Sequence, residues 1–304
     1  MLSLRAVAEH AGVSGARALG ARLKSGETSL RHLIQAAEIH RTYQSLGGFR
    51  SLLGTRMSSP SFALDGSARG NFRGGFIRLQ ADGTREARHK TVLRIRFRGF
   101  ECLDHSTGPG SEEPYFILSV LHPQVQLVHL LGRYEDVDEG DAIAGDAILI
   151  DGVTPEITAV SIVVREHDAG SEEEAKQKVL EKVREIGSAI ASAYALSEGI
   201  DSGGAELPDW TKLPGVDLLA EGFVSIFGLA DDQVGSHTAV FLDFRDGWTD
   251  EKGEWRNKPI LGKFQGNNYN WVSPVIGSGA EGQYRVYLLV ELIKVSIVID
   301  PLPE

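Results

Sequence analysis

Carboxylates in two loop-like stretches are the residues of this chain whose type and spacing best suit chemistry. Residues 99–121 read GFECLDHSTGPGSEEPYFILSVL, so that an apolar run meets an acidic, glycine-rich loop and leaves through Pro-Tyr into a second apolar run. Residues 230–242, ADDQVGSHTAVFL, place paired aspartates and a Val-Gly step before another apolar run. Calcium takes six to eight oxygen ligands, mainly carboxylates, carbonyls and water. The chemistry that such loops suggest is cation binding.

Both stretches resemble the calcium-loop signatures of C2 domains, in which one acidic loop precedes Asp-Pro-Tyr and a later one precedes Asp-aliphatic-Gly. The resemblance implies a β-sandwich with both loops at one end, and a membrane- or partner-binding module rather than an enzyme. It also implies a set of calcium ligands, namely Asp104, Glu113, Asp231 and Asp232. Glu113 stands where C2 domains have Asp, and SIFGL at 225–229 lacks their Asp-x-Asp, so the implied binding is weak. The alternative is polar turns between strands, with Pro114 at a sheet edge and Gly235 at a bulge.

A third acidic stretch, residues 134–141, packs five carboxylates into eight residues, YEDVDEGD. It lacks the Asp-x-Asp-x-Asp-Gly spacing of an EF-hand. It is therefore interpreted as a solvated acidic loop or as a docking surface for the basic N-terminal region, with a cation site as the alternative.

Length and composition restrict the class of protein. With 304 residues, 42% of them hydrophobic, the chain can bury one or two substantial cores. The single cysteine, Cys102, excludes an internal disulfide framework and a multi-cysteine zinc site. There is no apolar run of 18 residues, and the N-terminus lacks a clean signal-peptide pattern. We expect a cytoplasmic protein, or one released without a Sec signal peptide.

Charge is divided unevenly along the chain. Residues 1–100 contain 17 Lys and Arg against 6 Asp and Glu, whereas residues 101–304 contain 14 against 36. A basic region of this kind can contact nucleic acid or anionic lipid, or the two parts can attract each other within one chain or between subunits. We favour mutual attraction and hence a homo-oligomer, with an anionic membrane as the other candidate partner.

The N-terminal region, residues 1–57, is predicted to be basic and helical. Residues 7–14, VAEHAGVS, resemble the first helix and turn of lac-repressor-type helix-turn-helix proteins. The following helix offers Arg17 and Arg22 but otherwise mainly Ala, Leu and Gly, so it has few side chains that could read bases. Nucleic acid is therefore the less favoured partner. Arg17, Arg22 and Arg31 are the candidate interaction residues of this arm.

Apolar periodicity predicts an α+β fold, a C2-like β-sandwich with a helical insertion. Residues 58–75, rich in Ser, Gly and Arg, are predicted to be a linker, and residues 76–304 a β-sandwich domain with the insertion at about 171–229. A helix is predicted over 30–43, and a further helical segment within 210–229. The predicted strands are 76–79, 91–100, 115–121, 126–131, 147–150, 158–164, 238–244 and 283–299.

The clearest predicted helix spans about 172–196 and follows a capping box at 171–174. Apolar residues recur along it at heptad-like spacing, and Ile186 and Ile190 of this seam are the candidate interaction residues. Residues 187–196 are small and apolar but too few to span a bilayer. The seam is expected to pack on the sandwich or, in a toxin-like alternative, to act at a membrane.

No Walker A, HExxH or GxSxG motif is present. The leading hypothesis is thus a non-enzymatic binding or assembly protein that self-associates or engages anionic membrane. The alternative is a DNA-binding regulator with an N-terminal helix-turn-helix and a C-terminal sensor domain. Calcium is the one cofactor implied, weakly bound.

Overall fold

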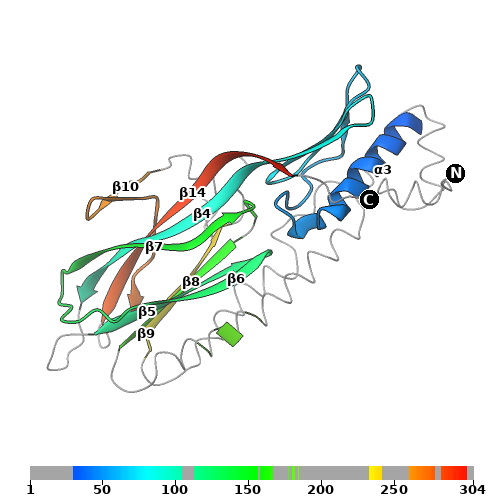
Figure 1. Cartoon of the computed structure of the whole chain (residues 1–304). Coiled ribbons are helices and arrows are strands. Elements are labelled where there is room, and N and C mark those ends of the chain that lie inside the picture. Colours follow the sequence, from blue (N-terminus) through cyan, green and yellow to red (C-terminus); the bar gives the residue numbers. More distant parts are fainter. Residues whose placement is uncertain are drawn as a thin grey trace. The chain divides into compact units, whose positions relative to one another are not determined.

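The computed structural model divides the chain into two compact units, coloured along the sequence in Figure 1. Unit 1 comprises Met1–Val92, Ala193–Asp209 and Lys294–Glu304, and unit 2 comprises Leu93–Ser192 and Trp210–Ile293. The structure describes residues 30–104, 113–156, 158–166, 177, 180, 181, 184, 233–241, 260–277 and 282–299. Most of them lie in β-strands, so the chain has a β-rich fold.

Unit 1 is an antiparallel meander with a helix packed on one face. Helix α3 (Leu30–Ser45) and the 3₁₀ turn η1 (Gly48–Arg50) precede the strands. Four strands then pair in sequence order, namely β1 (Ser61–Phe62), β2 (Ala68–Asn71), β3 (Gly75–Leu79) and the first part of β4 (Arg85–Asp104). A small core lies between α3 and the inner face of the sheet, made of Ile39, Tyr43, Leu53, Ala68, Phe72, Ile77, Leu79 and Ala87.

The segment 58–75 is folded rather than a linker, because it contains β1 and β2 and buries Ala68 and Phe72 in the core of unit 1. Its glycine content has a packing reason. A Cβ placed on Gly70 would lie 2.7 Å from a methyl carbon of Ile39, so α3 can approach β2 only over a glycine. Tyr43 of α3 stacks on Phe72 with ring centroids 4.6 Å apart.

Helix α3 confirms the predicted helix at 30–43, but its apolar face is divided. Leu33 and Ala37 are buried, whereas Leu30 and Ile34 are 53% and 49% exposed. The side of α3 that carries Gln35 faces the β1–β2 turn, because Gln35 Nε2 donates a hydrogen bond to Gly66 O over 2.6 Å. This side-chain bond to the backbone acts together with the burial of Leu33 and Ala37 on the side of α3 that faces the sheet.

Unit 2 consists of two antiparallel sheets that enclose one core (Figure 1). One sheet has the order β6-β5-β8-β9, formed by β6 (Val125–Leu131), β5 (Pro114–His122), β8 (Thr158–Glu166) and β9 (Gln233–Phe241). The facing sheet pairs β7 (Ala142–Val153) with the second part of β4, and β4 with β14 (Gln283–Ile299). Short strands complete it: β12 (Trp271–Val272) and β13 (Ile276–Gly277) pair with β14, and β10 (Gly262–Phe264) pairs with β11 (Asn267–Tyr269) as a separate hairpin.

An aromatic cluster fills the core between these sheets. Phe116 of β5 lies 4.5 Å from Phe100 of β4 and 6.0 Å from Tyr284 of β14, measured between ring centroids. Tyr134 closes the cluster from the loop after β6, at 4.8 Å from Phe100. Phe100, Phe116 and Tyr284 have no exposed surface. Inward-facing alternate residues of both sheets therefore meet in one continuous core, the arrangement expected when two amphipathic sheets pack face to face.

The two sheets of unit 2 approach each other at both edges. His129 Nε2 of β6 lies 2.7 Å from Leu149 O of β7. At the other edge, a Cβ on Gly235 of β9 would lie 2.4 Å from the backbone N of Gly277 in β13, so both strands need glycine there. Gly235, predicted as a bulge residue, is thus a point of close sheet-to-sheet contact, next to a register shift between Val164 and Arg165.

Most predicted strands agree with the structure. The segments 76–79, 115–121, 126–131, 158–164 and 283–299 are confirmed as β3, β5, β6, β8 and β14. Strands β4 and β7 are longer than predicted, and β9 begins five residues before the predicted 238. Of the predicted 172–196 helix, four residues are described, and Gln177, Leu180, Glu181 and Arg184 are all helical. Residues 1–29 and 210–229 lie outside the described residues.

A buried histidine at the β5–β6 turn makes the stability of unit 2 depend on pH. His122 is 1% exposed. Its Nδ1 accepts from Gln124 N over 3.1 Å, and Nε2 lies 2.9 Å from Thr154 O. An Nδ1 acceptor and an Nε2 donor require the neutral ring. Burial lowers the pKa of His122 from 6.5 to about 4.

We expect the free energy of unfolding to fall between pH 6.5 and pH 4, because the unfolded chain binds a proton at His122 in this range and the folded chain does not. The loss approaches about 3 kcal/mol at the acid end, at 1.36 kcal/mol per pKa unit. Urea titrations at several pH values measure it. His122→Gln keeps an amide able to donate and should flatten the slope, and an unchanged slope in this variant would contradict the assignment.

Candidate interaction surfaces

The predicted calcium ligands are only partly placed by the structure. Asp104 is the last residue of β4, and Glu113 directly precedes β5. The carboxylate of Glu113 lies 2.5 Å from the guanidinium of Arg133, so this ligand candidate already has a cation partner. Asp231 and Asp232 lie outside the described residues. Within the described ranges, no three His, Cys, Asp or Glu side chains are grouped closely enough to hold a metal ion.

Among the predicted interaction residues, only Arg31 is described. Its guanidinium donates to Gly66 O over 3.2 Å, beside the bond from Gln35, and so attaches the first turn of α3 to the β1–β2 turn. Arg31 therefore has a structural contact within unit 1, although the residue as a whole is exposed. Arg17, Arg22, Ile186 and Ile190 lie outside the described residues.

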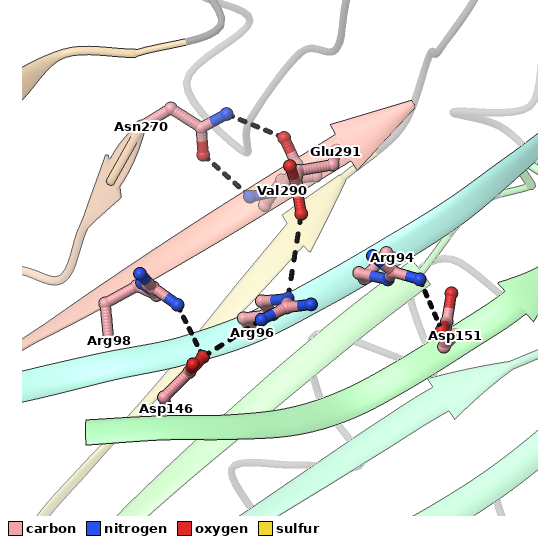
Figure 2. A network of polar contacts seen from close by, with 8 residues as sticks. All are labelled: Arg94, Arg96, Arg98, Asp146, Asp151, Asn270, Val290 and Glu291. Atoms are coloured by element: carbon pink, nitrogen blue, oxygen red, sulfur yellow. Dashed lines mark hydrogen bonds and ion pairs between the residues drawn. The ribbon is translucent and has the colours of Figure 1, made fainter. Parts of the chain in front are cut away.

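Three arginines on the outer face of β4 form an ion-pair row in unit 2 (Figure 2). Arg94 donates to Asp151 on β7 over 2.7 Å, and this hydrogen bond holds the pKa of the Asp151 carboxyl below its usual value. Arg96 contacts Asp146 of β7 at 3.2 Å and Glu291 of β14 at 3.8 Å. Arg98 also donates to Asp146.

Each guanidinium in this row thus faces a carboxylate of a neighbouring strand (Figure 2). Arg98 is the most enclosed, with 10% of its side chain exposed. An arginine that is already neutralised across its own sheet gains little from an external anion. The row is therefore an internal contact between β4, β7 and β14 and not a free anion site.

A different set of cations lies on the outer face of the β2–β3–β4 sheet of unit 1, on the side opposite α3. We call this set, Arg69, Arg78, Arg88 and Lys90, the basic face. Alternation places it there: Ala68, Ile77, Leu79 and Ala87 point into the core, so the residues between them point outward. Arg69, Arg78 and Lys90 are exposed, and 38% of the Arg88 side chain is exposed.

The pairing register brings these cations close together. Arg69 lies directly opposite Arg78, and Arg78 lies directly opposite Glu86 on the next strand. Glu86 is the only carboxylate that β2, β3 and residues 85–92 of β4 carry on this face, and it contacts Arg88. Like charges placed directly opposite each other destabilise a sheet. Arg78 thus lies between a like charge, Arg69, and an opposite charge, Glu86, and it also attracts the Asp65 carboxylate of the β1–β2 turn.

An aromatic side chain forms the floor of the basic face. The guanidinium carbon of Arg69 lies 4.2 Å from the ring centroid of Phe76, and Lys90 Nζ lies 5.0 Å from the same centroid. Phe76 is only 7% exposed, because these cations cover it. Cation–π contacts hold the two cationic heads over the sheet and limit the entropy that they would lose on binding.

The acidic stretch after β6 is the complementary surface, in unit 2. We call its five exposed carboxylate residues, Glu135, Asp136, Asp138, Glu139 and Asp141, the acidic loop. Val137, in the middle of the loop, is fully buried in the core. Hydrogen bonds from Cys102 N to Asp141 O and from Gly140 N to Cys102 O, each 2.9 Å, attach the loop to β4.

Several hydrogen bonds thus hold the backbone of the acidic loop. Asp138 N also donates to Asp141 Oδ2 over 2.9 Å, and Asp136 has a left-handed φ of 55°. The predicted solvated acidic loop agrees with this exposure. The basic face was not predicted residue by residue: the charge count of residues 1–100 was its one signal, because the register that gathers the cations is not readable from the sequence.

No protein-family model, curated protein or solved structure matches this chain. No described helix has the length and apolar character needed to cross a membrane. Function must therefore be inferred from the two charged surfaces themselves.

Proposed function

We propose that the protein is a non-enzymatic binding and assembly protein, with unit 2 as a C2-like β-sandwich and unit 1 as a basic binding module. Its basic face binds a negatively charged partner surface. One observation carries this proposal: the described strands β2, β3 and residues 85–92 of β4 place four cations and a single carboxylate, Glu86, on one outward sheet face. The chain as a whole has a net charge of −11, so the basic face is opposite in sign to the protein's net charge.

The basic face suits binding rather than catalysis because its groups are cationic donors fixed on a sheet. Lys and Arg supply donors for carboxylate, sulfate or phosphate oxygens. The sheet and the Phe76 floor hold these donors in place before binding, which reduces the entropic cost of association. Weak calcium binding by Asp104, Glu113, Asp231 and Asp232 remains part of the C2-like hypothesis, and a partner at the basic face does not depend on it.

Retention on a heparin column in a sodium chloride gradient tests the proposed function. We expect the full chain to be retained at low salt despite its net negative charge, because a local cluster of cations dominates at short range. Arg69→Glu/Arg78→Glu should elute at much lower salt. The matched control, Arg50→Glu/Lys263→Glu, makes the same change in net charge at exposed positions outside the basic face and should elute like the unaltered chain.

Equal shifts in the two double variants would show that net charge alone governs retention. That result, or passage of the unaltered chain through the column at low salt, would contradict the proposed function. Circular dichroism of each variant checks that the strands are intact.

A further inference from the structure

We propose that the partner of the basic face is the acidic loop of a second copy of this chain, so that copies associate head to tail. This inference rests on the proposed function and names its partner. The two surfaces are complementary in sign and similar in number, four cations facing five carboxylates. They occur in different units of the chain, so each copy presents both halves of the contact.

The shape of the acidic loop supports a protein partner. The loop is anchored at Val137 and by its hydrogen bonds to Cys102, so its carboxylates project from a fixed backbone. A loop anchored in this way can present carboxylates to the cations of the basic face while little conformational freedom is lost. The opposite charges also orient the approach of the two copies and increase the association rate at low salt.

The surroundings of the basic face disfavour a flat anionic membrane. The β1–β2 and β3–β4 turns lie at the same end of the sheet, because Ala68 pairs with Leu79. Each turn carries an exposed carboxylate, Asp65 or Asp82, whose pKa is lowered by a hydrogen bond from the backbone N–H of Ser67 or Thr84, respectively. An anionic bilayer that covered the face would also approach these ionised groups and Glu86, whereas a single loop need not.

The contact joins two different surfaces, so it is heterologous. Heterologous contacts repeat from copy to copy and give rings or open filaments rather than a closed two-fold dimer. Exposed ion pairs are individually weak, about 0.2–1 kcal/mol each, and are screened by salt. We therefore expect a concentration-dependent distribution of oligomers that shifts toward monomer as salt is raised.

Complementary variants of the full chain test the inference by sedimentation velocity. The face variant is Arg69→Glu/Arg78→Glu, and the loop variant is Glu135→Lys/Glu139→Lys. Asp141 is left intact because its carboxylate accepts a hydrogen bond from Asp138 N within the loop. Each variant alone should be monomeric, with a dissociation constant for self-association raised on the order of 100-fold, since attraction becomes repulsion at each changed position.

An equimolar mixture of the two variants should form a heterodimer and no larger oligomer. The loop variant retains an intact basic face and the face variant an intact acidic loop, so one complementary contact remains, while both outer surfaces have lost most of their attraction for further copies. Combining all four substitutions in one chain leaves each surface with three carboxylates and two cations, so this chain should stay monomeric. The control Arg50→Glu/Lys263→Glu should assemble as the unaltered chain does.

A mixture that stays monomeric, or an unaltered chain that is monomeric at every concentration, would overturn the head-to-tail inference. Flotation with vesicles containing about 30% phosphatidylserine, and a gel shift with duplex DNA, supply the competing partners. Binding to either that is lost in the face variant, without self-association, would assign the basic face to lipid or nucleic acid instead. The proposed function would then stand, because heparin retention tests the basic face separately from assembly.

Discussion

Phe116→Ala is expected to lower the free energy of unfolding of unit 2 by about 3–5 kcal/mol, the usual range for deleting a fully buried phenylalanine side chain. Phe116 has no exposed surface and lies at the centre of the aromatic cluster, near Phe100, Tyr134 and Tyr284. Its aromatic neighbours come from the facing sheet and from the loop after β6, so the side chain is enclosed on several sides and its deletion leaves a cavity. Urea denaturation followed by circular dichroism measures the loss.

Two further substitutions calibrate that result. Phe116→Leu fills most of the volume and should cost far less than alanine. Phe62→Ala removes the same side chain from a half-buried position in unit 1 and should also have a smaller effect. A loss below about 1 kcal/mol for Phe116→Ala would mean that the two sheets do not share the core described here.

Asn270→Ala is expected to lower the free energy of unfolding by about 2–6 kcal/mol, because it leaves two buried backbone groups without partners, at about 1–3 kcal/mol each. The Asn270 amide brackets Val290 of β14, accepting from Val290 N over 2.7 Å and donating to Val290 O over 2.6 Å (Figure 2). Asn270 is 1% exposed, so water cannot readily replace either bond. Thermal and urea unfolding both measure the effect.

Asn267→Ala is the matched control for Asn270→Ala. Asn267, three residues earlier, is half-buried and makes one long side-chain bond, 3.3 Å, to Gly145 O, so its replacement should cost less than about 1 kcal/mol. Asn270→Asp keeps the acceptor but removes the donor and buries a carboxyl group, so it should be nearly as damaging as alanine. Equal, small losses of unfolding free energy at both asparagines would contradict a stabilising role for the two Asn270–Val290 hydrogen bonds.

The strands that could be predicted from sequence are those with a local hydrophobic signal. Strand β8 was predicted as a buried strand from its β-branched run, and Val160, Ile162 and Val164 have no exposed surface. Strand β14 was predicted with its correct bounds, since apolar residues continue from 283 to 299. In both strands the residues that fill the core lie within one short segment of the chain, so their pattern can be recognised in the sequence.

Strand β2 could not be predicted in the same way. Its four residues, ARGN, have little β propensity, and the surrounding Ser, Gly and Arg are typical of a linker. Packing against α3 decides its structure, because Gly70 lies against Ile39 and Ala68 enters the core. A glycine required by a neighbouring helix is indistinguishable in the sequence from a glycine of a flexible segment.

The charged surfaces were also predictable only in part. From the sequence it follows that positive charge is concentrated in residues 1–100, that residues 134–141 form an acidic stretch, and that the chain is rich in strands. Which cations act together depends on the fold. Arg94, Arg96 and Arg98 are neutralised across β4, β7 and β14, whereas Arg69 and Arg78 stand side by side on an outward face. Net charge is a sum over residues, so it can be counted from the sequence. A charged surface depends instead on the register of the strands, and register is set by contacts between residues far apart in the chain.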